Sequence, residues 1–119
     1  MEIYGGIMNK AVLVGRICKD IELRYTKNGK ATTDFIIAVN RNYKNINGEY
    51  ETDFINITVY GPTAENIASF CRKGDMIGIE GGLRHDVYET ENGKRSKDYI
   101  LAEKVMFLSP KGEWYARNI

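Results

Sequence analysis

Hydrophobic and polar residues alternate strictly along residues 54–60, which read Phe-Ile-Asn-Ile-Thr-Val-Tyr. Successive side chains of a β-strand point to opposite faces, so one face of this segment carries only branched aliphatic residues and can enter a core. The other face begins with Phe54, ends with Tyr60 and has two polar residues between them. The pattern therefore predicts a half-buried strand whose exposed face carries an aromatic ring at each end.

Similar patterns predict the rest of the chain to be rich in strands. The expected strands are 9–18, with 22–25 as a short continuation of it, 31–42, 76–88 and 96–108. Turn residues separate them at 26–29, at Asn47-Gly48 and at 91–94. Gly15 lies in the middle of the first strand, where a small barrel often bends.

One segment, 62–73, has the spacing of a helix. Its apolar residues recur every three or four positions: Ala64, Ile67, Ala68 and Cys71. Thr63 is the expected N-cap, and Gly74 is placed to cap the C-terminus. Five strands with a single short helix between the third and the fourth is the order of the all-β, five-stranded Greek-key barrel known as the OB-fold.

The exposed face of the predicted barrel carries candidate binding residues. Phe54 and Tyr60 lie ~20 Å apart along their strand, so they are two separate platforms rather than one packing unit. In 76–88, alternation places Arg84 and Tyr88 together on one side. The apolar residues of that strand fall on the other side: Ile77, Ile79, Leu83 and Val87. Aromatic rings along a solvated sheet face, next to basic residues, are suited to stack the bases of an unpaired nucleic acid strand and neutralise its phosphates.

Tyr43 is a further aromatic residue whose placement follows less directly from the pattern. Simple alternation puts it on the same side as Phe35 and Val39, which is the side of the core. It reaches the exposed face only beyond the end of its strand or after a β-bulge.

Length and charge narrow the class of protein. The 119 residues predict one domain, and 43% hydrophobic with 28% charged residues is ordinary for a globular chain. The net charge is only +1, but residues 9–30 carry six basic and two acidic residues, whereas 45–71 carry four acidic and no basic ones. Binding of nucleic acid depends on the local field, so the near-neutral total does not exclude it.

Other classes of site lack support in the sequence. Cys18, Cys71 and the single histidine, His85, do not have the spacing of metal ligands, so we expect two buried free thiols and no metal or cofactor. The chain shows no run of ~18 apolar residues and no signal-peptide pattern. A cytoplasmic location, nucleoid-associated and away from membranes, is therefore expected.

Eight segments, in order, resemble the bacterial and phage single-stranded DNA-binding proteins. They are 9–16 (NKAVLVGR), 20–29 (DIELRYTKNG), 38–43 (AVNRNY), 53–56 (DFIN), 59–61 (VYG), 64–66 (AEN), 72–75 (RKGD) and 79–84 (IEGGLR). The resemblance covers residues 8–108, which we take as the domain that binds single-stranded DNA. It implies an OB-fold protomer, usually a homotetramer, that binds single-stranded DNA with little sequence preference during replication, recombination and repair.

The resemblance also implies site residues. The base-stacking aromatics of the family fall on Tyr43, Phe54, Tyr60 and Tyr88, three of which the alternation had already selected. Basic residues at positions of phosphate contacts are Lys10, Arg16, Arg24, Arg41, Lys73, Arg84 and Arg95. Asp86 departs from the family, where a basic residue is common, and so puts this stretch of the DNA path in question.

Both ends of the chain depart from the family pattern. Residues 1–7 precede the usual start at Met8-Asn9, and we expect no structural role for this extension. Residues 109–119 take the place of the acidic tail through which many members recruit replication and repair enzymes, but they carry a net charge of +1 and two aromatics. We therefore expect no tail-mediated recruitment, either because the chain is a tailless paralogue from a phage or mobile element or because a longer protein has been truncated.

Two other classes of function compete with this interpretation. Some nucleases use the same fold, but we find no carboxylates predicted to converge on one pocket, so no enzyme is expected. The alternative is a protein-interaction subunit of a primosome-like assembly, with weak affinity for DNA.

Overall fold

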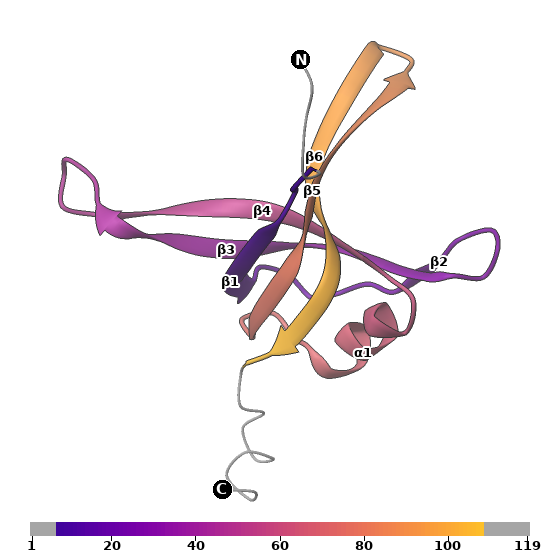
Figure 1. Ribbon diagram of the computed structural model, residues 1–119, viewed down its shortest axis with the longest axis horizontal. Helices are drawn as coiled ribbons and strands as arrows, with labels where there is room; N and C mark the ends of the chain where they lie inside the picture. Colours follow the sequence, from indigo (N-terminus) through magenta and orange to yellow (C-terminus); the bar gives the residue numbers. More distant parts are fainter. Residues whose placement is uncertain (1–6, 109–119) are drawn as a thin grey trace, which may run out of the picture.

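The computed structural model describes residues 7–108, which form a closed barrel with one helix (Figure 1). The expected N-terminal segment, apart from Ile7, and the C-terminal segment 109–119 lie outside the described residues. The elements are β1 (Ala11–Ile17), β2 (Arg24–Tyr25), β3 (Ala31–Lys44), β4 (Tyr50–Tyr60), α1 (Pro62–Phe70), β5 (Met76–Thr90) and β6 (Gly93–Phe107).

The strands form one sheet in the order β1-β5-β6-β4-β3-β2. A further antiparallel pairing of β1 with β3, at Arg16 with Ala38 and Ile17 with Ile37, closes this sheet into a barrel. Because β2 has only two residues, five long strands remain, and α1 lies between the third and the fourth of them. The predicted five-stranded OB-fold with one short helix is therefore confirmed.

Isoleucine dominates the core of the barrel. Six isoleucine side chains are at most 2% exposed: Ile17, Ile37, Ile57, Ile67, Ile77 and Ile79. They come from β1, β3, β4, β5 and α1, so one apolar cluster joins the helix to the sheet. The alternation predicted for 54–60 is confirmed at Ile57 and Val59, which are buried, and at Phe54 and Tyr60, which are exposed.

Two glycines allow backbones to approach closely where the barrel bends and closes. A Cβ atom on Gly15 would lie 2.7 Å from the Ala38 carbonyl oxygen, next to the β1–β3 closure. A Cβ atom on Gly81 would lie 2.1 Å from the Leu101 carbonyl oxygen, beside a register shift between β5 and β6. Both distances are far below van der Waals contact, so these positions require glycine.

The helix is shorter than its apolar spacing predicts. It ends at Phe70, because Cys71 adopts an extended backbone, and Gly61 rather than Thr63 is its N-cap residue. Pro62 occupies the first helical position, where its fixed φ suits the helix and no N–H is needed. Gly74 does not cap the helix; it has a φ of 91° in the next turn, where its N–H donates to the Ile17 carbonyl.

Two hairpins extend beyond the barrel as arms (Figure 1). The β3–β4 arm starts earlier on its second strand than expected, at Tyr50, and the β5–β6 arm continues to a tight tip between Thr90 and Gly93. Among residues 7–108, no layer covers the far part of the second arm, so Leu83 and Val87, which alternation places on the core side, are 54% and 60% exposed. The predicted continuation of the first strand is also wrong, since β2 pairs with β3.

Both cysteines lie within residues 7–108. Cys71 is buried, as expected, whereas Cys18 is only half-buried. Within this range, no three His, Cys, Asp or Glu side chains gather to hold a metal ion. The described residues also contain no helix with the length and apolar character needed to cross a membrane.

Candidate nucleic-acid interface

The outward positions of β3, β4, β6 and the first half of the β5–β6 arm form one continuous surface, which we call the outer face. Phe54 and Tyr60 lie at the two ends of its β4 portion and are 69% and 42% exposed. The register β3–β4 pairs them with Ala38 and Thr32, two small residues that leave the rings accessible. The structure thus places the two predicted platforms on one surface, separated by Asn56 and Thr58.

The same register gives each ring a basic neighbour. Arg16 pairs with Ala38 across the β1–β3 closure, and Ala38 pairs with Phe54. Arg24 pairs with Thr32, which pairs with Tyr60. Directly paired residues share a face, and adjacent strands are ~4.8 Å apart, so each arginine lies two strands, roughly 10 Å, from its ring. Sequence reasoning did not foresee these neighbours, because they depend on how the barrel closes.

Arg84 and Tyr88 project from the β5–β6 arm on the outer face, as alternation predicts. Arg84 pairs with Tyr99 and Tyr88 pairs with Arg95, so a basic and an aromatic residue face each other twice. The Asn9 side chain holds the base of this arm: its amide donates to the Leu83 carbonyl at 2.8 Å and accepts from the Leu83 N–H at 2.9 Å. These two side-chain hydrogen bonds join the chain before β1 to β5, beyond the last backbone pairing of Ala11 with Gly81.

Tyr43 lies apart from the other predicted aromatics, on the β3–β4 arm. The register of that arm shifts between Asn40 and Lys44, and Tyr43 is 62% exposed. This register shift is the β-bulge or irregularity that Tyr43 needs in order to reach the exposed side. Figure 1 shows the two arms pointing in different directions, so Tyr43 on β3 and Tyr88 on β5 lie on separate extensions of the protein.

Four of the predicted phosphate contacts already have partners within the chain. Arg24 pairs with Asp34. Arg41 contacts Glu51 at 2.6 Å and Asp53 at 3.0 Å. The Lys10 ammonium lies 3.4 Å from Glu103, and the Arg16 guanidinium donates to the Gly74 carbonyl at 3.0 Å. A phosphate bound by one of these side chains must compete with, or share, an existing acceptor.

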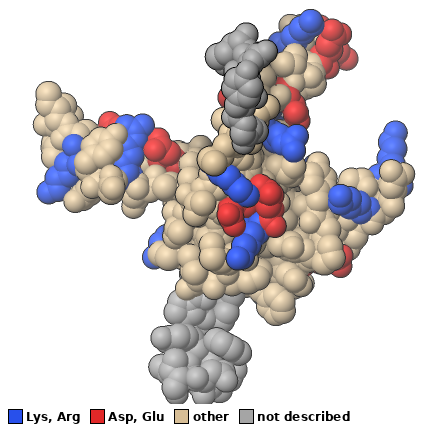
Figure 2. Space-filling view, in the orientation of Figure 1, with Lys and Arg blue, Asp and Glu red and all other residues tan. Residues whose placement is uncertain are grey.

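The other three cations, Lys73, Arg84 and Arg95, form no ion pair within residues 7–108. All three are exposed. On the face that Figure 2 shows, Lys and Arg side chains are spread over the body and the projecting loops instead of gathering in one patch. Such scattered cations suit a ligand that crosses a long path and is contacted at intervals.

The Arg41 ion pairs perturb both partners. Its hydrogen bonds to Asp53 raise the pKa of Arg41, and the same bonds hold the pKa of Asp53 below its ordinary value. Both groups are therefore firmly charged at neutral pH, and neither is poised to transfer a proton. The pair links β3 to β4 and braces the arm that carries Tyr43.

Sequence reasoning missed several residues that share this surface. Tyr50 is 59% exposed, and it has the same parity on β4 as Phe54 and Tyr60, a signal hidden because the strand was expected to start later. Lys30 places its ammonium 5.1 Å from the centre of the Tyr60 ring. Lys97 and Tyr99 on β6 also belong to this surface, because β6 pairs in parallel with β4, which the pattern of the sequence does not reveal.

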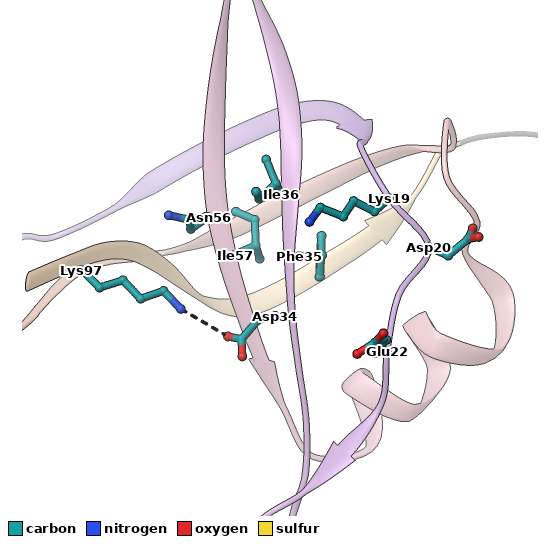
Figure 3. Close-up of a pocket in the computed structure, with 9 residues that line it drawn as sticks. All are labelled: Lys19, Asp20, Glu22, Asp34, Phe35, Ile36, Asn56, Ile57 and Lys97. Carbon is teal, nitrogen blue, oxygen red and sulfur yellow. Dashed lines mark ion pairs between the residues drawn. The ribbon is translucent and has the colours of Figure 1, made fainter. Parts of the chain in front are cut away.

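A pocket of about 290 Å³ opens beside Asp34 on β3 (Figure 3). Lys97 reaches toward it from β6, with its ammonium 3.9 Å from the Asp34 carboxylate. The Thr58 hydroxyl donates to the same oxygen of that carboxylate, and Lys19 also lines the pocket. Charges of both signs meet here in a hollow of the outer face. Two further carboxylates line the pocket, but no three His, Cys, Asp or Glu side chains of residues 7–108 gather to hold a metal ion.

The family model described as "Single-strand binding protein family" matches residues 8–108. Among curated proteins, "Single-stranded DNA-binding protein 2" of Listeria monocytogenes is 49% identical over 106 residues, or 88% of this chain and 66% of that protein. "Single-stranded DNA-binding protein A" of Bacillus subtilis is 47% identical over 88% of this chain and 62% of its own length.

A shorter relative has nearly the same extent as this chain. "Single-stranded DNA-binding protein B" of Bacillus subtilis is 42% identical over 106 residues, which cover 88% of this chain and 94% of that protein. The match to the family model, over residues 8–108, includes every described element from β1 to β6, together with both arms. On this similarity and on the confirmed barrel, the chain belongs to the single-strand binding protein family.

Proposed function

We propose that the protein binds single-stranded DNA with little sequence preference and protects it during replication, recombination and repair. The observation that carries this proposal is the register of the outer face, which sets Phe54 and Tyr60 two strands away from Arg16 and Arg24. A strand laid across β4 can stack bases on the rings while its phosphates meet the guanidinium groups. No catalytic step is part of this function.

The kind of contact explains both parts of the expected selectivity. Every base has a π-face, so stacking on Phe54, Tyr60, Tyr88 and Tyr43 does not depend on base identity. A duplex hides these faces between neighbouring base pairs, so it cannot use the same rings. The names of the relatives support single-stranded DNA as the ligand.

The phosphate contacts fall into two groups. Arg84, Arg95 and Lys73 are free of ion pairs in the described chain and can bind phosphate directly. Arg24, Arg41, Lys10 and Arg16 must first exchange or share a carboxylate or carbonyl partner. We expect the first group to contribute more to affinity, because binding there breaks no internal ion pair.

We further propose that the protein assembles as a homotetramer in the cytoplasm, associated with the nucleoid. Val12 and Val14 on the outside of β1 are 66% and 48% exposed, and Met106 and Leu108 are 38% and 43% exposed. Val14 pairs with Gly78, and Gly78 pairs with Met106, so this apolar surface is continuous across three strands. It lies away from the rings of β4 and could be covered by a second copy.

Alanine substitution of Phe54 and Tyr60 tests the stacking mechanism. Each change should weaken binding of a labelled oligothymidine by ~1–3 kcal/mol, because each removes one base platform. Phe70→Ala is the matched control, since Phe70 is 60% exposed but lies on α1. Unchanged affinity in both variants, with an intact oligomer, would remove the mechanism and favour the protein-interaction subunit.

A further inference from the structure

Tyr99 is an aromatic residue at the centre of the outer face, between the positions of the predicted platforms. On one side it pairs with Arg84 of β5. On the other side β6 runs parallel to β4, and the Asn56 amide donates to the carbonyl of Asp98, the residue before Tyr99. The ring therefore lies beside the stretch of β4 that separates Phe54 from Tyr60.

The contacts of Tyr99 fix its phenol group. Its hydroxyl donates to the Asp86 carboxylate at 2.8 Å, across the β5–β6 ladder. The hydrogen bond to Asp86 raises the pKa of Tyr99, and the phenol of Tyr60 and the guanidinium of Arg84 also act on it, so both groups lie in its surroundings. The side chain is half-buried and keeps part of its surface open to solvent.

Lys97 supplies a cation next to this ring. Its ammonium lies 5.5 Å from the centre of the Tyr99 ring and 3.9 Å from the Asp34 carboxylate. That carboxylate is already bonded to Arg24 and to the Thr58 hydroxyl, so Lys97 is its most distant partner. The ammonium is therefore the group most easily transferred from Asp34 to an incoming phosphate.

From this arrangement we propose that Tyr99 and Lys97 form an additional subsite for one nucleotide. Tyr99 stacks the base, Lys97 binds the adjoining phosphate, and Asp86 is a positioning residue that orients the phenol. This explains why an acidic residue is tolerated at position 86 in the DNA path: its charge is used to hold a ring that bases contact. The proposal rests on the proposed function, since the subsite requires that single-stranded DNA cross the outer face.

Photocross-linking of the unmodified chain tests contact directly. An oligothymidine in which 5-iododeoxyuridine replaces thymidine is bound, irradiated and digested with trypsin. Cleavage after Lys97 and Lys104 releases residues 98–104, a peptide whose one aromatic residue is Tyr99. A cross-link on this peptide is the expected result. Binding and cross-links elsewhere, with none on 98–104, would overturn the subsite and leave the proposed function intact.

Salt-dependent affinities of three variants separate the roles of the two residues. Tyr99→Ala should weaken binding by about 5- to 150-fold with the salt slope unchanged, whereas Tyr99→Phe, which keeps the ring, should lose much less. Lys97→Gln should lower the log–log slope by about 0.7, as expected for one phosphate. The control Lys104→Gln changes an exposed lysine on the same strand, beyond the register shift.

These binding measurements distinguish a wrong subsite from a wrong proposed function. If the unmodified chain binds but Tyr99→Ala binds like Lys104→Gln, the subsite is wrong. If the unmodified chain itself binds no oligonucleotide at low salt, the proposed function fails. Equal loss in Tyr99→Ala and Tyr99→Phe would also contradict stacking, because it would assign the effect to the hydroxyl alone.

Discussion

Gly81 shows how a single position lets the barrel close. A Cβ atom there would meet three backbone atoms of Leu101 and Ala102, the nearest at 2.1 Å. Backbone cannot move aside as a flexible side chain does, so β5 and β6 would have to separate at the register shift. This close contact lies directly below the arm that carries Arg84 and Tyr88.

We therefore predict that Gly81→Ala destabilises the protein by at least about 1–3 kcal/mol, the usual cost of overpacking. Thermal unfolding followed by circular dichroism, at equal protein concentrations, measures the change in Tm. Gly82→Ala is the control, since its Cβ would lie 3.3 Å from the nearest atom, the Asn9 carbonyl oxygen. A Tm for Gly81→Ala equal to that of Gly82→Ala would contradict the packing described at this register shift.

At the scale of elements, the two arms depend on different supports. The β5–β6 arm is held at its base by Asn9, whereas the β3–β4 arm is braced by the contacts of Arg41 with Glu51 and Asp53. These side chains are exposed, so the ion pairs contribute little to global stability. Their effect is local: they keep the arm that carries Tyr43 and Tyr50 ordered.

We predict that Arg41→Gln speeds amide hydrogen exchange in residues 42–50 with little change in Tm. Asp53 has a folded-state pKa below its ordinary 3.8, so its stabilising contribution is complete above that value and is lost as pH falls through the lowered pKa. In an NMR titration of its side-chain carboxyl carbon, the midpoint should lie below 3.8 and rise in Arg41→Gln. Arg41→Lys keeps the charge but not the forked geometry. Its exchange rates and its Asp53 midpoint should therefore lie between those of the unmodified chain and those of Arg41→Gln. Identical exchange and midpoints in all three proteins would show that the arm does not need this brace.

Element by element, alternation was enough to predict the barrel, because a half-buried strand repeats every two residues wherever it lies. Phe54, Tyr60, Arg84 and Tyr88 were found in this way. The pairing of Arg16 with Ala38, and so its nearness to Phe54, could not be predicted, since it depends on a contact between strands distant in the chain. Tyr99 was missed for the same reason: its place beside β4 follows from the parallel β4–β6 pairing.

At the scale of the whole molecule, two surfaces have different chemistry. The outer face over β3, β4 and β6 carries rings and cations, whereas Val12 and Val14 on β1 form an apolar surface with Met106 and Leu108. Apolar surface of this kind, continuous over neighbouring strands, is typical of protein–protein interfaces. Assembly through it would leave the outer faces of the subunits available to one DNA strand.

The assembly prediction is that sedimentation velocity gives four times the 13.6 kDa chain mass. Val14→Asp should reduce this mass, because burying an unpaired carboxylate at the interface is costly. The same change at Val87, a valine that is 60% exposed on the β5–β6 arm, is the control. An unmodified chain that sediments as a monomer at every concentration would remove the homotetramer.

The most direct test of the whole account is the salt dependence of binding to single-stranded DNA, measured by fluorescence anisotropy of a labelled oligothymidine with duplex DNA as competitor. We predict tight binding at low salt, a log–log slope of about −0.7 for each phosphate neutralised, and little competition from duplex. A slope near zero would contradict the role of the cations. Absence of binding at low salt, or equal competition by duplex, would contradict single-strand binding itself.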